Sequence, residues 1–204
     1  MNKSMNKKYE LTNETILHNG KVLHRIRALK DFGDVKAGEF GGYIESENNL
    51  SQTGDCWVYD DAKVRDNAVI FGNAKAFGNS VIRDNAWVCD NALIFGNAVI
   101  HGHAVVCGDV KVCGNPVICD NIFIQSDNDY VTVRGLDSEY RNATVFKTKN
   151  KNIAVECGYF YGTLAEFTEF ANKLKETHGN GNSKFAKEYL MLIELIKVRF
   201  ELEN

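Results

Sequence analysis

The sequence predicts a mainly β protein whose centre is a parallel β-helix of about four coils. A six-residue repeat runs from Gln52 to Asp129, and a hexapeptide period is typical of that fold. The first position of the hexads is apolar throughout after Gln52, and the fifth is Ala in most of them. Between these two positions stands a break of Gly or Asp followed mostly by Asn.

Each hexad is predicted to form a short strand followed by a corner. Side chains alternate across a strand, so the fifth residue of one hexad and the first of the next face inward, and the two variable positions face outward. Gly, Asn and Asp tolerate a left-handed backbone, which allows the chain to turn sharply. The small fifth column is expected at a narrow interior, where a larger residue would overpack.

The segment DNAVIFGNAKAFGNSVIRDNAWVCDNALIFGNAV, residues 66–99, resembles the left-handed β-helix of hexapeptide-repeat proteins, in which three hexads make one triangular coil. The resemblance implies the left-handed winding, which breaks the usual right-handed crossover rule. The flanks, DFGDVKAGEFGGYIESENNLSQTGDCWVYDDAKV (residues 31–64) and VECGYFYGTLAEFTEF (residues 155–170), resemble uncharacterised repeat proteins common in phages and prophages. Hexapeptide-repeat proteins are usually homotrimers, so the resemblance also implies a trimer.

Three regions are predicted: an N-terminal hairpin and cap over residues 1–51, the β-helix over 52–129, and a C-terminal α+β segment over 130–204. Met1–Lys8 is expected to fray. A hairpin is predicted over Thr15–Leu29 around an Asn19-Gly20 turn. The Gly-rich, aromatic segment Asp31–Ser51 is expected to cap the open end of the β-helix, with a ligand loop as the alternative.

The C-terminal segment is predicted to hold strands over residues 130–133 and 143–161, followed by two helices. Thr163 and Glu166 form a capping-box pattern at the start of the first helix, which is expected to end near residue 178. Ser183 is expected to cap the second helix, which extends to about Glu203 and is apolar on two sides. Such a helix needs two partners: the preceding helix, and either the β-helix or another subunit.

Composition favours a soluble intracellular protein, and the resemblance to phage and prophage proteins implies the cytosol of a bacterial host. The chain has 204 residues and a net charge of −3 with acids and bases interspersed, so nucleic acid is not an expected partner. Its apolar runs are too short to span a membrane, and the N-terminus lacks a signal-peptide core. The six cysteines follow no paired spacing and are expected to be reduced thiols.

An 18-residue coil places four basic side chains on one outer wall, where a ladder of cations repels itself unless an anion or neighbouring carboxylates compensate. Asp60, Asp66 and Asp84 stand at adjacent corners, so compensation by these carboxylates is the default expectation. The alternative is a site for a phosphate-bearing small molecule or for the acidic surface of a host protein. The other two walls are too apolar to face water and require cover from the C-terminal segment or a second copy. The four ligand-binding candidates are Lys63, Arg65, Arg83 and His101.

His101 and His103 are the candidate catalytic bases. Hexapeptide-repeat acyltransferases, which the repeat resembles, use a histidine base at the cleft between subunits. Those enzymes generally carry an inserted loop, which this repeat lacks, so the alternative is an imidazole packed at a subunit seam. No metal and no cofactor are expected, because Cys107, Cys113 and Cys119 lie on successive walls, and the stacked pair Cys89 and Cys107 offers only two ligands. The alternative is a metal held by three copies of one cysteine around a trimer axis.

Two classes of function follow. The favoured one is a non-catalytic binding or scaffold protein of phage or prophage type. Such a protein could act in counter-defence, either by sequestering a nucleotide signal or by blocking a host effector. The alternative is an acyltransferase that uses an acyl-CoA donor and His101 or His103 as base. Binding is favoured because the repeat has no inserted loop, and because no acidic residue is spaced in the sequence to orient a histidine.

Overall fold

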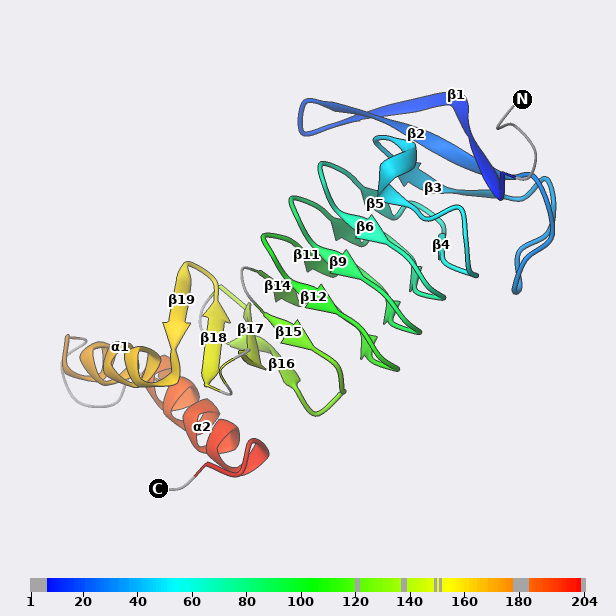
Figure 1. Cartoon of the computed structure of the whole chain (residues 1–204). Helices are drawn as coiled ribbons and strands as arrows, with labels where there is room; N and C mark the ends of the chain where they lie inside the picture. The colour runs from blue at the N-terminus through cyan, green and yellow to red at the C-terminus, as the bar shows by residue number, and fades with distance from the viewer. Residues whose placement is uncertain are drawn as a thin grey trace. The chain divides into compact units, whose positions relative to one another are not determined.

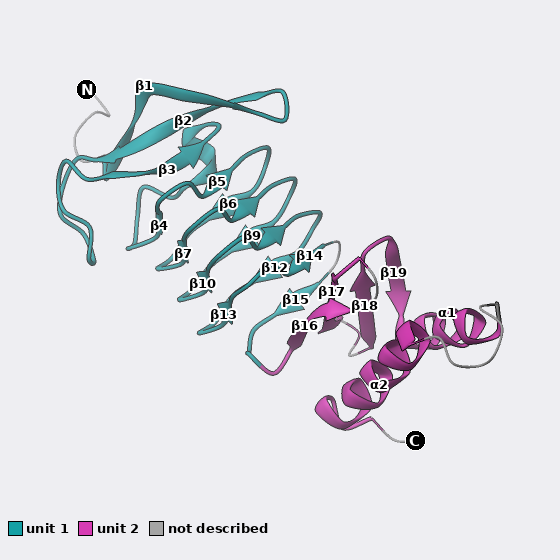
Figure 2. Cartoon of the chain, turned by 180° about the vertical axis from the view of Figure 1, so that it is seen from behind, with its two compact units in different colours: residues 1–127 teal, residues 128–204 magenta. Residues whose placement is uncertain are grey.

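The computed structural model describes residues 7–119, 122–136, 139–148, 150, 152–177 and 184–202. The chain divides into two compact units, residues 1–127 and residues 128–204 (Figure 2). The first unit contains the repeat, and the second contains an antiparallel sheet and two helices.

Short strands of two residues, β4 to β15, wind into a parallel β-helix (Figure 1). They form three walls, with strand orders β13-β10-β7-β4, β15-β12-β9-β6 and β5-β8-β11-β14. Val99 pairs in register with Val81 on one side and Val117 on the other, so one coil spans three hexads. The predicted left-handed β-helix of about four coils is confirmed. The strands are β4 (Trp57–Val58), β5 (Lys63–Val64), β6 (Val69–Ile70), β7 (Lys75–Ala76), β8 (Val81–Ile82), β9 (Trp87–Val88), β10 (Leu93–Ile94), β11 (Val99–Ile100), β12 (Val105–Val106), β13 (Lys111–Val112), β14 (Val117–Ile118) and β15 (Phe123–Ile124).

The corners have the left-handed backbone that the Gly and Asp positions predict. Asp66 and Asp84 have φ values of 58° and 61°. Gly96 also has a positive φ, and a Cβ there would lie 2.6 Å from the carbonyl oxygen of Gly114 in the next coil. Corner carboxylates link successive coils, as where Asp84 Oδ2 accepts a hydrogen bond from the Gly102 N–H at 3.1 Å. Asp therefore adopts the left-handed backbone of a corner, and its carboxylate also forms a hydrogen bond to the next coil.

Small side chains from the fifth position of the hexads lie in the interior of the β-helix, as predicted. Ala86 and Ala98 are completely buried, as are the neighbouring first-column residues Val88 and Ile100. The inward and outward assignment of the hexad positions is therefore confirmed.

The N-terminal hairpin consists of β1 (Tyr9–His18) and β2 (Lys21–Ala28), so it begins earlier than the predicted Thr15. Its turn is at Asn19-Gly20, as predicted. β3 (Phe40–Ile44) pairs antiparallel with β2 and parallel with β5, which extends one wall into a seven-stranded sheet. A short 3-10 helix, Glu47–Asn49, follows β3.

The prediction that Met1–Lys8 frays is wrong for Lys8, whose side chain is only 1% exposed. Its Nζ donates to the carbonyl oxygens of Cys56 at 2.8 Å and Gly54 at 3.2 Å. These carbonyls lie in the first coil, next to β4, the end strand of its sheet. Lys8 therefore satisfies carbonyls that no preceding strand can pair. Residues 1–6 of the predicted frayed segment lie outside the described residues.

The second unit is a four-stranded antiparallel sheet with two helices packed on one face. Strand residues Val145 and Val155 form the core with Phe167, Leu192 and Ile196 from the helices. The elements are β16 (Tyr130–Leu136), β17 (Arg141–Lys147), β18 (Ile153–Cys157), β19 (Phe160–Thr163), α1 (Leu164–Thr177) and α2 (Lys184–Arg199).

The predicted capping box opens α1. Thr163 Oγ1 accepts a hydrogen bond from the Glu166 N–H at 3.3 Å, and Glu166 Oε2 accepts one from the Thr163 N–H at 2.8 Å. The predicted ends of α2, Ser183 and Glu203, lie outside the described residues. In the part of the chain that the structure describes, no helix is long and apolar enough to span a membrane.

Candidate functional site

One outer column of the β-helix gathers the basic residues that the sequence singled out. Arg65, Arg83 and His101 each follow the strand of their coil, β5, β8 and β11, and these strands are in parallel register. Lys63 lies on the same wall, on the outward side of β5. The predicted column of basic residues is therefore present, with neighbouring rungs roughly 4.7–4.9 Å apart.

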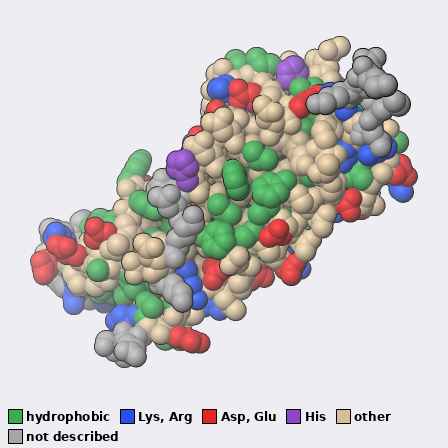
Figure 3. All heavy atoms as spheres, in the orientation of Figure 1, with side chains coloured by type: hydrophobic (Ala, Val, Ile, Leu, Met, Phe, Trp, Pro, Cys, Tyr) green, Lys and Arg blue, Asp and Glu red, His purple; other side chains and the backbone are tan. Residues whose placement is uncertain are grey.

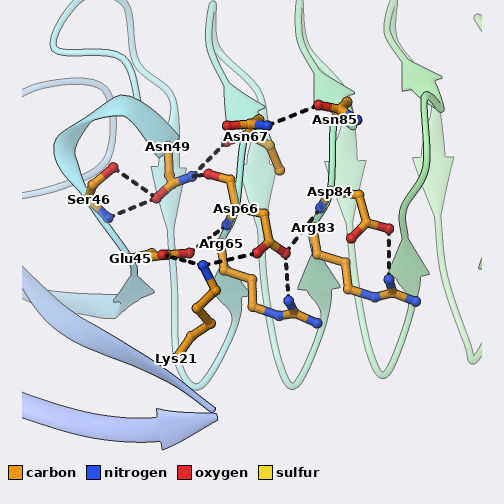
Figure 4. Close-up of polar contacts among 11 residues, drawn as sticks. Lys21, Glu45, Ser46, Asn49, Arg65, Asp66, Asn67, Arg83, Asp84 and Asn85 are labelled. Atoms are coloured by element: carbon orange, nitrogen blue, oxygen red, sulfur yellow. Dashed lines mark hydrogen bonds and ion pairs between the residues drawn. The ribbon is translucent and has the colours of Figure 1, made fainter. Parts of the chain in front are cut away.

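Corner carboxylates partner two of these cations (Figure 4). Arg65 Nη1 lies 2.5 Å from Asp66 Oδ2, and Arg83 Nη1 lies 2.7 Å from Asp84 Oδ2. Asp60, the third carboxylate expected to compensate, accepts instead from the backbone N–H of Gly78 at 3.0 Å.

The hairpin adds charges that the repeat alone does not predict. Lys21 Nζ lies 2.9 Å from Glu45 Oε1 and 3.6 Å from Asp66 Oδ1 (Figure 4). His18, at the end of β1, lies close enough to Lys63 and Arg65 for their charges to act on it: burial first, and then these two charges, lower the pKa of His18. Sequence analysis missed His18, since its position depends on how a long hairpin folds across the wall.

His101 has an acidic neighbour that sequence analysis also missed. His101 Nδ1 lies 3.6 Å from Asp84 Oδ2, and their side chains are 23% and 35% exposed. Desolvation raises the pKa of Asp84, but the Gly102 N–H, Arg83 and His101 outweigh it and lower the pKa below its ordinary value. Asp84 is therefore a carboxylate at neutral pH. The signal was available: stacking His101 on Arg83 puts the next corner residue, Asp84, beside it.

His103, the other candidate base, is exposed at the following corner. It occupies the place that Asn85 has one coil earlier, where Asn67 and Asn85 are joined by an amide ladder at 3.1 Å. Of the two candidates, His101 is the one for which an acidic neighbour is observed.

The other two walls carry apolar and aromatic columns, as predicted. Tyr59, Phe77 and Phe95 stack with ring centroids 4.4 Å and 4.8 Å apart. On the remaining wall, Phe71 meets Trp87 edge-on at 6.0 Å, and hydrophobic side chains gather over β6, β9 and β12 (Figure 3). What covers these walls stays a prediction.

All six cysteines lie among the described residues, and they are thiols rather than disulfides. Cys107, Cys113 and Cys119 follow β12, β13 and β14, so they lie on three different walls as predicted. Cys89 and Cys107 stack on one wall, following β9 and β12.

No family model matches this chain. Over 39 residues it is 51% identical to an uncharacterised acetyltransferase, YdcK, of Escherichia coli strain K12. The match covers 19% of this chain and only 12% of that protein. Neither comparison supports the resemblance to phage and prophage proteins. The β-helix and the local similarity are together consistent with a hexapeptide-repeat β-helix.

Proposed function

We propose that this protein is an acyltransferase in which His101 is the general base and Asp84 orients it. The observation that carries the proposal is the 3.6 Å separation between His101 Nδ1 and Asp84 Oδ2 on the outer face of the β-helix. Catalytic hydrogen bonds are often long in the absence of substrate and tighten in the complex. The local similarity to a protein named as an acetyltransferase supports acetyl as the group transferred.

In this mechanism the Nε2 atom of His101 takes the proton from a hydroxyl or amine of the acceptor. As this proton leaves, the acceptor attacks the thioester carbonyl of an acyl-CoA donor, and the tetrahedral intermediate collapses by breaking its C–S bond, which releases CoA as a thiolate. The imidazolium returns its proton to the leaving thiolate. Asp84 selects the tautomer with the proton on Nδ1 and stabilises the imidazolium, as the acidic member of a catalytic triad does.

The cations beside His101 suit an acceptor that carries a negative charge. Arg83 and Arg65 lie one and two rungs from His101, so an anionic group there is roughly 5–10 Å from the base. Binding at this distance would orient the acceptor for attack. In this proposal the active form is the homotrimer implied by the resemblance, and the neighbouring subunit closes the site.

The test is acetyl-CoA turnover with a panel of phosphorylated or carboxylated amines and alcohols, followed by mass spectrometry of the products. His101→Ala should lower kcat by about 10²–10⁴-fold, the usual contribution of a general base. His103→Ala is the matched control and should leave kcat within about twofold. Turnover that survives His101→Ala, or no turnover with any acceptor of this class, would contradict the proposal.

A second candidate is a non-catalytic protein that binds a phosphate-bearing molecule or an acidic host protein on the same wall. One observation favours it: among the described residues, Arg65 Nε is a buried donor without a hydrogen-bond partner, on a side chain only 12% exposed. Lys63, Arg83 and His101 would complete this site. A phage counter-defence role that sequesters a nucleotide signal or blocks a host effector would be one form of it.

Calorimetry with cyclic dinucleotides separates the two candidates. The binding candidate predicts no acetyl-CoA turnover, and an affinity that Arg65→Gln and His101→Asn both weaken and that His103→Ala leaves within a few-fold, with the oligomer unchanged by gel filtration. The acyltransferase predicts that His101→Asn abolishes turnover. Absence of binding across the panel would remove the signal-sequestering form of the second candidate.

A further inference from the structure

We propose that Cys89, Asp90 and Cys107 form a binding site for a thiophilic metal ion, with Zn²⁺ as the expected ion. The site lies on the β15-β12-β9-β6 wall, and so on a different wall from His101. It is independent of the acyltransferase proposal, because it shares no residue with that site.

The β-helix positions both thiols. β9 and β12 pair in parallel register, with Val88 opposite Val106, and Cys89 and Cys107 come directly after these two strands. The Cys89 N–H donates to the Val106 carbonyl oxygen at 2.9 Å, which holds the two rungs together at this point. The two sulfur atoms and one carboxylate oxygen of Asp90 all lie within 4.8 Å of one another.

This spacing suits a tetrahedral ion. Zinc–sulfur bonds of about 2.3 Å place two sulfur ligands about 3.8 Å apart, and zinc–carboxylate bonds are about 2.0–2.2 Å. Small rotations of the Cys89 and Cys107 side chains would therefore bring the three atoms into a coordination sphere. Two thiols and a carboxylate select a soft or borderline ion over Ca²⁺ or Mg²⁺, which prefer oxygen ligands alone.

Asp90 is held in place by the corner it occupies. Its φ is 57°, and its Oδ2 accepts a hydrogen bond from the Gly108 N–H at 3.1 Å. This hydrogen bond anchors the Asp90 side chain to the next coil, at a corner where one of its carboxylate oxygens lies within 4.8 Å of both sulfur atoms. A hydrogen bond to a ligating carboxylate is the outer-shell support that metal sites commonly have.

Burial favours the site as well. Cys89 and Cys107 are only 8% and 5% exposed, while Asp90 is exposed and provides the route from solvent. When ionised, the three groups carry three negative charges in little space, and a divalent cation neutralises most of that charge. They leave the fourth position of a tetrahedral ion for water or an external ligand, as in zinc sites that act on a substrate.

This inference departs from the prediction that the chain binds no metal. That prediction counted Cys89 and Cys107 as two ligands and left out Asp90. The corner residue after a stacked cysteine points back toward it, just as Asp84 lies beside the stacked Arg83 and His101.

Titration of the reduced full-length chain with Co²⁺ tests the site, because cobalt–thiolate bonds give a charge-transfer absorption band in the near ultraviolet. The band should saturate at one ion per chain and disappear when Zn²⁺ is added. Cys89→Ser and Cys107→Ser should each abolish it, whereas Cys113→Ser, which removes an exposed thiol on another wall, should leave it intact. Asp90→Asn should weaken Co²⁺ affinity by about tenfold or more, since even outer-shell partners contribute 10–100-fold.

Zn²⁺ should also raise the melting temperature of the parent protein and of the Cys113→Ser variant, but not that of Cys89→Ser or Cys107→Ser, the two cluster variants. Circular dichroism of each variant checks that it is folded, and Cys89→Ala gives a second, apolar replacement. A band that Cys113→Ser abolishes, or that survives both cluster variants, would overturn the site. So would the absence of any band, or a Cys89–Cys107 disulfide in freshly purified protein.

Discussion

Lys8 Nζ lies 2.8 Å from the carbonyl oxygen of Cys56 and 3.2 Å from the sulfur of the same residue. The side chain also passes over the Phe32 ring, at 4.9 Å from its centroid. A residue near the start of the chain thus closes the first coil of the β-helix, where strand pairing ends.

Replacing Lys8 with Met should destabilise the protein by about 1–3 kcal/mol, because the buried Cys56 carbonyl would be left without this donor and the Gly54 carbonyl would also lose its bond to Lys8. Urea denaturation measures the change in the free energy of unfolding. Lys7→Met is the matched control: Lys7 forms an exposed ion pair with Glu47, and such pairs contribute only about 0–1 kcal/mol. Equal effects of the two variants would contradict the capping role.

Ala86→Leu and Ala98→Leu should each destabilise the protein by about 1–3 kcal/mol, because both methyl groups face a filled interior. Val99→Leu changes the outward residue next to Ala98 and should be close to neutral. Urea denaturation compares the three variants. Neutral results at both alanines would mean that the interior accommodates a larger side chain.

Asp84→Asn should reduce stability at neutral pH and much less in acid. Although desolvation opposes it, the Gly102 N–H, Arg83 and His101 lower the pKa of Asp84 below its ordinary 3.8. The stability from this carboxylate is therefore present above the ordinary pKa and is lost as pH falls through the lowered folded value. Unfolding of parent and variant at pH 7 and at about pH 3 checks this, and a difference independent of pH would contradict it.

Glu156 should make the second unit less stable as pH rises. Desolvation raises its pKa from 4.5 to about 7, so the folded state binds this proton more tightly than the unfolded state does. The resulting stabilisation is complete in acid and is lost between these two pKa values. Glu156→Gln should therefore raise the melting temperature relative to the parent more at pH 8 than at pH 5. Glu169→Gln, on an exposed ion pair with Lys173, is the control.

Cys113 should be the thiol that reacts rapidly with Ellman's reagent, because it is exposed and the other five cysteines are buried. Desolvation, with help from Asp90 and Cys107, raises the pKa of Cys89 to about 12, so few thiolates form there. Stopped-flow absorbance should show one fast equivalent per chain, and Cys113→Ser should remove it. A fast phase that survives this change would mean that the wall around Cys89 opens readily.

The repeat allowed much of the first unit to be predicted, because the period determines which residues face inward and which residues stack. Ala86, Ala98 and the column of Arg65, Arg83 and His101 were all identified in this way. The hairpin turn and the capping box of α1 were also predicted, since each depends on a few neighbouring residues.

Contacts between distant segments were not predicted. Lys8 meets Cys56 across 48 positions, and no periodic pattern connects them. The approach of His18 to Lys63 depends on the length and twist of the hairpin, which the Asn19-Gly20 turn does not determine. Asp84 beside His101 is different: the coil length alone indicates it, once corner residues are included in the stacking.

The three-hexad coil also constrains how this gene can change in length. Adding one whole coil between Arg83 and His101 would keep both residues on the same wall, because strands 18 positions apart pair in register. Removing a single hexad would instead carry every later residue to the neighbouring wall, so that His101 would no longer follow the strand stacked on that of Arg83. Insertions and deletions that keep the later residues on their walls should therefore come in multiples of a coil, and variation in related genes should show that step.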